Sequence, residues 1–144
     1  MRLSKTVEQA CCILSILAEH HGQPVTNVEL NERMNVSQSY LTKITRKLVI
    51  AGIITSAQGV KGGFILARPM TSITLGDVVK ATDGSAPFFQ PTNVIKQAFP
   101  AQEYIVYRGV KLLHDGFMRA EQKWFDELNL ITMEQLISKA KTTR

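Results

Sequence analysis

Hydrophobic residues recur every three or four positions in three segments of the first fifty residues, which predicts three helices with one buried face each. The first covers residues 5–20. The second covers 26–34 and begins with Thr26 and Glu29, the pair of residues that forms a capping box. The third covers 37–50, with a serine at its N-cap position and a glycine just beyond its end. A short helix, a tight turn and a longer helix are typical of a helix-turn-helix.

Two short β-branched or apolar runs, 53–57 and 63–67, follow the third helix and are separated by glycines. Glycines beside a lysine invite comparison with a phosphate-binding loop, but such a loop places Ser or Thr after the lysine and then a helix. Here Gly62 follows Lys61, and a strand pattern comes next. The pattern therefore predicts a β-hairpin wing. A capped helix over 74–84 completes this part of the chain.

In the remaining chain, a segment without hydrophobic periodicity is followed by a segment with the periodicity of a helix. Residues 85–101 contain three prolines and three phenylalanines without periodicity, which predicts a linker. One long amphipathic helix is predicted over 102–128, and a short one begins at Thr132. The apolar seam of the long helix, which we expect to mediate dimerisation, consists chiefly of Val106, Val110, Leu113, Phe117 and Trp124. The predicted fold is mainly α: a winged helix-turn-helix domain over 1–84, the linker, and a helical dimerisation region over 102–144.

The distribution of charged residues along the chain adds a functional indication to the predicted fold. The 144 residues carry a net charge of +5, with 44% hydrophobic residues. Between Arg33 and Gly76 there are six basic residues and no acidic one, which indicates a surface for a polyanion. No apolar run reaches the roughly 18 residues of a membrane span, so we expect a cytoplasmic protein with no membrane partner.

The exposed face of the third helix has the residue types that read DNA. Hydrogen-bonding side chains near its beginning suit base edges, and basic side chains further along suit phosphates. We expect base contacts from Gln38, Ser39 and Tyr40, and phosphate contacts from Lys43, Arg46, Lys47 and, in the wing, Lys61. An ordinary solvent-facing helix would also carry glutamates, and this one has none. Double-stranded DNA is therefore the predicted partner.

Two other classes of function compete with DNA binding. An enzyme would need a nucleophile–base pair or metal-ligand spacing, and the three histidines, His20, His21 and His114, supply neither. We therefore predict no enzymatic activity and no metal site. The alternative that remains is a helical protein-interaction module with a degenerate winged helix.

Three blocks of this sequence resemble the Rrf2-type winged-helix transcription regulators of bacteria. They are "VSQSYLTKITRKLVIAGII" (36–54), "GVKGGFILARP" (59–69) and "ITLGDVVKATDG" (73–84). The resemblance implies a homodimer that is held by the long helices, binds a two-fold-related operator and usually represses. Two departures stand out. Gln58 occupies a position where the family commonly has arginine, and residues 85–103 lack the three cysteines with which many members bind an iron–sulfur cluster.

The regulatory signal has two open interpretations. No iron–sulfur cofactor is expected, and Cys11 and Cys12 are adjacent and the only cysteines, which excludes an internal disulfide framework. They are candidates for thiol sensing, although an apolar helix stripe is expected to bury them. The other interpretation is a small effector near the aromatic loop, where small residues on the long helix permit either close helix packing or a pocket. The loop residues are Phe88, Phe89 and Phe99, and the helix residues are Gly109, Leu113, Gly116 and Ala120.

Overall fold

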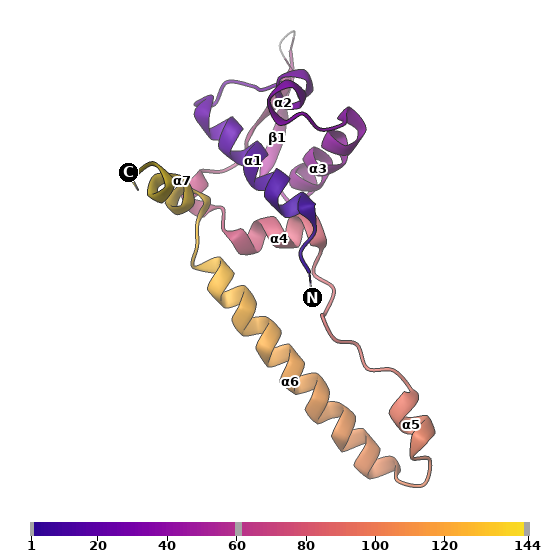
Figure 1. Ribbon diagram of the computed structural model, residues 1–144. Helices are drawn as coiled ribbons and strands as arrows, with labels where there is room; N and C mark the ends of the chain where they lie inside the picture. Colours follow the sequence, from indigo (N-terminus) through magenta and orange to yellow (C-terminus); the bar gives the residue numbers. More distant parts are fainter. Residues whose placement is uncertain (1, 60–61, 143–144) are drawn as a thin grey trace. The chain divides into compact units, whose positions relative to one another are not determined.

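The computed structural model describes residues 2–59 and 62–142 (Figure 1). In chain order its elements are α1 (Lys5–Glu19), α2 (Asn27–Met34), α3 (Gln38–Ile50), β1 (Ile54–Ala57), β2 (Gly63–Leu66), the 3-10 turn η1 (Met70–Ser72), α4 (Leu75–Asp83), α5 (Val94–Ala98), α6 (Glu103–Asn129) and α7 (Met133–Thr142). The chain forms two compact units. One comprises Arg2–Gly84 together with the chain from Leu128 onward, and the other is Ser85–Glu127.

The helix-turn-helix has part of the local chemistry that the sequence predicts: Ser37 stands at the N-cap of α3, but its side chain makes no capping hydrogen bond. Thr26 and Glu29 form both bonds of a capping box at the start of α2. The turn to α3 passes through Asn35, whose φ of 50° places it in the left-handed region that asparagine tolerates. Asn31, at the crossing of the two helices, donates a hydrogen bond from its side-chain amide to the carbonyl oxygen of Val36. This bond ties the end of α2 to the segment that leads into α3.

The wing is an antiparallel hairpin in which Ile54 pairs with Leu66 and Ala57 with Gly63. A third segment joins it, because Val25 exchanges two backbone hydrogen bonds with Phe64, at N···O distances of 3.0 and 2.8 Å. This approach requires glycine at position 63, where a Cβ atom would lie 2.5 Å from the carbonyl oxygen of Val25. The wing is therefore attached to the loop that precedes α2.

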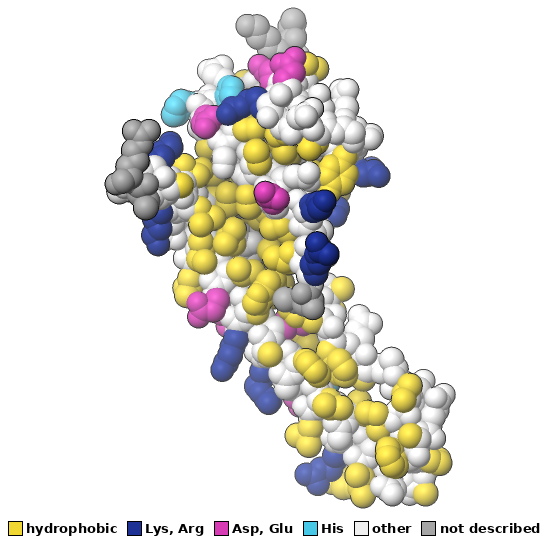
Figure 2. All heavy atoms as spheres, in the orientation of Figure 1, with side chains coloured by type: hydrophobic (Ala, Val, Ile, Leu, Met, Phe, Trp, Pro, Cys, Tyr) yellow, Lys and Arg dark blue, Asp and Glu magenta, His cyan; other side chains and the backbone are white. Residues whose placement is uncertain are grey.

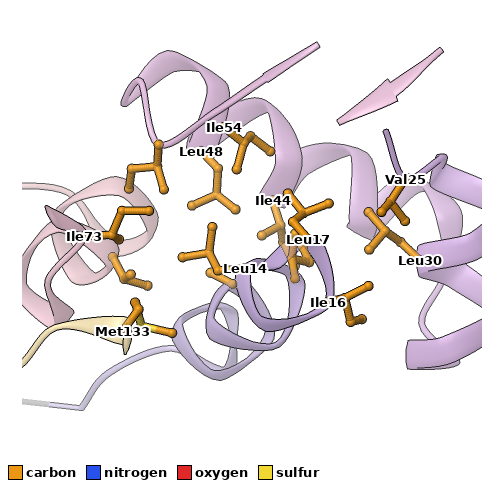
Figure 3. Close-up of a cluster of buried hydrophobic side chains, with 14 of the residues drawn as sticks. Leu14, Ile16, Leu17, Val25, Leu30, Ile44, Leu48, Ile54, Ile73 and Met133 are labelled. Atoms are coloured by element: carbon orange, nitrogen blue, oxygen red, sulfur yellow. The ribbon is translucent and has the colours of Figure 1, made fainter. Parts of the chain in front are cut away.

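A single apolar core holds the first unit together (Figure 3). Leu14 and Leu17 of α1 pack among Ile44 and Leu48 of α3, and all four are at most 2% exposed. Met133 of α7 lies in the same cluster. None of the described helices is long and apolar enough to cross a membrane.

The structure corrects two predictions about the second half of the chain. The segment 102–144 is not one helical region apart from the core of the first unit, because Met133 is buried in that core and Ile137 packs against it. The stretch 85–101 is not entirely a linker either, since it contains α5. Five residues are too few for a periodic signal to distinguish this helix from a loop.

The second unit is organised around α6. Phe89 stacks on Phe117 with ring centroids 4.6 Å apart, and Phe88 meets Trp124 edge-on at 5.3 Å. The backbone N–H of Phe88 donates to the carboxylate of Glu121 at 3.0 Å, and Glu121 is largely buried. Residues 88 and 89 therefore cover part of the seam that the sequence assigns to a dimer partner.

Candidate nucleic-acid interface

The face of α3 that points away from the core is polar and basic. Leu41, Ile44 and Leu48 are buried on one side of the helix. The exposed residues on the rest of the helix include four of the predicted DNA contacts: Gln38, Ser39, Lys43 and Arg46. The structure thus leaves these four side chains accessible on one element of a helix-turn-helix.

Tyr40 lies differently from the other predicted base contacts. Its ring is half-buried against the core, and its hydroxyl oxygen is 2.9 Å from that of Thr6 on α1. The expectation that Tyr40 projects from the exposed face is therefore wrong. Its position four residues before the buried Ile44 is the sequence signal that places it toward the packed side of the helix.

Lys47 is an exposed residue, yet its ammonium has a partner within the protein. Its Nζ donates a hydrogen bond to the carbonyl oxygen of Thr82 in the last turn of α4. A cation there is favourable because the carbonyl groups at a helix C-terminus carry partial negative charge. Lys47 therefore joins α3 to α4, a contact that sequence spacing does not reveal because the two residues are 35 positions apart.

The base of the wing is fixed by an arginine that the sequence assigned only to the basic stretch. One Nη atom of Arg68 lies 3.0 Å from the carboxylate of Asp77, and the other donates to the carbonyl oxygen of Ser72. Partial burial opposes ionisation of Asp77, but hydrogen bonds from Thr74 and Arg68 and the charge of Arg68 outweigh it and lower the pKa of the carboxyl. The predicted phosphate contact Lys61 lies outside the described residues.

Comparison with known proteins agrees with this geometry. A family model described as Rrf2, iron-dependent transcriptional regulator, matches residues 3–139. The chain belongs to the Rrf2 family. It is 34% identical to YwgB, an HTH-type transcriptional regulator of Bacillus subtilis, over 94% of this chain and 82% of YwgB. The Rrf2 winged-helix fold predicted from the sequence is thereby confirmed.

Solved structures of regulators share the fold. The oxidized form of Staphylococcus aureus CymR superposes with a TM-score of 0.62 at 26% identity, covering 94% of this chain and 95% of CymR. A transcriptional regulator from Listeria innocua superposes with a TM-score of 0.69 at 21% identity, covering 100% of this chain and 89% of that one. The relatives YwgB and CymR are both named as HTH-type transcriptional regulators.

The donor set of this Rrf2 chain does not fit a cluster held by three thiolates. The chain has two cysteines in total, and both lie on α1. Iron–sulfur clusters are held chiefly by cysteine thiolates. With two cysteines in the chain, a third ligand would have to be a side chain of another type. The segment 85–103 of this Rrf2 chain therefore cannot provide the cysteine ligation that its resemblance to other members would suggest.

The two cysteines differ in environment. Burial raises the pKa of the Cys11 thiol, whose side chain is only partly accessible. Cys12 is exposed, which corrects the expectation that an apolar stripe buries both. The more accessible of the two thiols is therefore that of Cys12.

A cavity of about 680 Å³ lies within the second unit, between residues 91–96 and the first half of α6. Its lining combines apolar and charged side chains, among them Val106, Val110, Lys96 and Glu103. This cavity does not contain the residues expected for a pocket, but a second cavity of about 330 Å³ is lined by two of them, Phe89 and Leu113. A Cβ atom at Gly109 or Gly116 would meet nothing within 4 Å. The two glycines of α6 thus leave an open surface, while the 680 Å³ cavity is lined by larger residues of α6 and by the preceding segment.

Proposed function

We propose that the chain is a homodimeric repressor that binds a two-fold-related operator in double-stranded DNA. The observation that carries this proposal is the exposed face of α3, which lacks acidic residues and stands on a helix-turn-helix followed by a wing. A helix placed in this way enters a major groove with its first residues toward the bases. Membership of the Rrf2 family supports the same function.

The exposed residues divide into two roles. Gln38 and Ser39, at the beginning of α3, supply donors and acceptors for base edges. Lys43 and Arg46 supply positive charge for phosphates, which fixes the register of the protein on the duplex without selecting a sequence. Lys61 is proposed as a further phosphate contact. Glycines precede and follow it in the sequence, and because they have no side chains they allow close approach to the DNA backbone.

Dimerisation through α6 is supported by apolar side chains that the second unit leaves uncovered (Figure 2). Val106 is only 8% exposed in the single chain, whereas Leu113 and Phe117 are 46% and 49% exposed. A second seam is more open, with Ile105 and Leu112 at 65% and 70% exposure. Large uncovered apolar surfaces are uncommon on monomers, so a second copy of α6 is the proposed partner.

The open seam also has a geometry suited to helix packing. Ile105, Gly109, Leu112 and Gly116 follow one another at spacings of four, three and four residues. The two glycines leave room for a partner helix to approach closely, because the separation of packed helices depends on the side chains at their contact. We therefore place the dimer contact on this seam together with Leu113 and Phe117, and assign Val110 and Trp124, which are half-buried, to its edge.

The regulatory input is proposed to be a small effector in the cavity beside α6. A volume of about 680 Å³ lies within the usual range for small-molecule sites. Because both Lys96 and Glu103 line it, the ligand would combine an apolar body with charged groups. Oxidation of Cys12 is the second input to test, since its thiol is accessible. Neither input requires an iron–sulfur cluster.

A gel-shift experiment with DNA from upstream of the protein's own gene tests the proposed function. We expect a shifted complex that excess unlabelled specific DNA removes and unrelated DNA of equal length does not. Arg46→Gln should weaken the complex, while Lys123→Gln, an exposed change on α6, serves as the matched control. Equal competition by unrelated DNA would favour the alternative of an interaction module without DNA reading.

A further inference from the structure

Arg68 follows the second strand of the wing by two residues and belongs by sequence to the basic stretch. Charge alone would make it a phosphate contact. Its guanidinium is instead engaged on both sides, toward the carbonyl oxygen of Ser72 and toward the carboxylate of Asp77 at 3.0 Å. About a third of each side chain of this ion pair is exposed. The planar fork of arginine offers donors on two separate nitrogen atoms in a fixed geometry, whereas the donors of a lysine all lie on one nitrogen atom.

Asp77 connects this ion pair to the beginning of α4. Its carboxylate accepts the backbone N–H of Thr74 at 3.0 Å, and its own backbone N–H donates to the Thr74 hydroxyl oxygen at 3.1 Å. The same Thr74 hydroxyl donates to the side-chain oxygen of Asn129 at 3.1 Å. Four side chains thus link the base of the wing to the last residue of α6.

The backbone around Asn129 is fixed by further contacts. Leu75 donates its N–H to the carbonyl oxygen of Ile131 at 2.9 Å, and Met133 donates to that of Ile73 at 2.8 Å. Position 76 is occupied by glycine, and a Cβ atom there would overlap the side chain of Asn129. The network of Arg68, Asp77, Thr74 and Asn129 is therefore built into a tightly fitted junction.

We propose that Arg68 is a positioning residue for DNA binding, which sets the wing relative to α4 through Asp77 and does not contact a phosphate. This role rests on the proposed function. Because Thr74 also bonds Asn129, the orientation of the wing depends on the end of α6 as well. A change at any of the three positions 68, 77 or 129 should therefore affect DNA binding in the same way.

The test measures binding of the full chain to a fluorescent duplex that the wild-type protein selects from random-sequence DNA, over about 50 to 200 mM salt. The variants are Arg68→Gln, Arg68→Lys, Asp77→Asn and the double variant Arg68→Gln/Asp77→Asn. Arg46→Gln is the control for loss of a phosphate contact. Asp77→Asn retains an oxygen that can accept the Thr74 N–H, and thermal unfolding of every variant establishes that binding is measured on folded protein.

We expect each single change of Arg68 or Asp77 to weaken binding about tenfold, without changing the slope of log K against log salt concentration. The double variant should be no weaker than either single one, because both changes break the same ion pair. Arg68→Lys should fail to restore binding although it keeps the charge. Asn129→Ala should weaken binding, again at unchanged slope, while Arg46→Gln should lower the slope by about one.

Two results would overturn the positioning role alone. One is a slope that falls by about one in Arg68→Gln and returns to the wild-type value in Arg68→Lys, which would identify a direct phosphate contact. The other is wild-type affinity in all of the Arg68 and Asp77 variants. A wild-type protein that selects no duplex would instead refute the proposed function, and the positioning role with it.

Discussion

The attachment of the wing to the first unit can be tested at Gly63. Alanine at this position would bring its Cβ to 2.5 Å from the carbonyl oxygen of Val25, and to 2.7 Å from the carbonyl carbon. Both neighbours are backbone atoms, so the clash cannot be relieved by rotating a side chain. We expect the two hydrogen bonds between Val25 and Phe64 to be lost.

The expected loss of stability follows from these contacts. Each of the two backbone hydrogen bonds contributes about 1 kcal/mol. The strain that remains after the strand moves adds about 1 kcal/mol or more, as in other overpacked sites. We therefore expect Gly63→Ala to lower the free energy of unfolding by about 2 to 4 kcal/mol.

Denaturant unfolding at a fixed protein concentration measures this difference. Gly62→Ala is the matched control, because its Cβ would lie 3.2 Å from the carbonyl oxygen of Ala57 and requires a shift of only a few tenths of an ångström. Its effect should stay below about 1 kcal/mol, the usual range for changes that disturb no specific contact. Equal stabilities of the two variants would refute the argument that the Val25–Phe64 pairing depends on glycine.

Four further predictions concern recognition, assembly, acid stability and sensing. Gln38→Ala should cost about 1 to 3 kcal/mol of binding free energy and relax specificity at one base pair, measured by competition with single-base operator variants; equal loss on all sequences would contradict base reading. Leu112→Glu should give monomers in sedimentation experiments and should weaken operator binding, while the exposed control Lys123→Gln stays dimeric. A monomeric wild-type protein would contradict the proposed dimer. Folding lowers the pKa of Asp77, so its ionised form stabilises the folded state above the ordinary pKa of 3.8, and this contribution is lost as the pH falls through the lower folded-state pKa. Asp77→Asn should remove that part of the dependence of the free energy of unfolding on acid pH. An acid dependence equal to that of the wild-type protein would contradict this assignment. Protein purified without oxygen should be colourless, and a stoichiometric visible chromophore would contradict the absence of an iron–sulfur cluster. A thiol reagent should modify Cys12 before Cys11. An oxidant response that survives Cys11→Ser/Cys12→Ser would rule out thiol sensing at these cysteines.

Local signals were sufficient to predict most of the elements. The capping boxes at Thr26 and Thr74 and the glycine after α3 mark helix ends through contacts within three residues, so they can be recognised without tertiary structure. The hairpin was predictable for the same reason, because its glycines and its β-branched runs are adjacent in the chain.

The features that the sequence did not reveal depend on distant partners. Lys47 contacts Thr82, and Met133 enters a core made mostly by residues of the first half of the chain. The polar group of Tyr40 suits DNA and predicts a place on the exposed face, yet Thr6 on α1 provides a partner for its hydroxyl. The seam of α6 was identified by spacing, but spacing could not show that residues 88 and 89 cover part of it.

The most direct test of operator binding by a two-fold dimer is a hydroxyl-radical footprint on the DNA upstream of the protein's own gene. Two recognition helices related by a two-fold axis should protect two similar half-sites on one side of the duplex. Their centres should be separated by about one helical turn, roughly 34 Å, or a multiple of it, and Arg46→Gln should weaken both equally. A single protected segment, or protection that does not follow the helical repeat, would contradict the account.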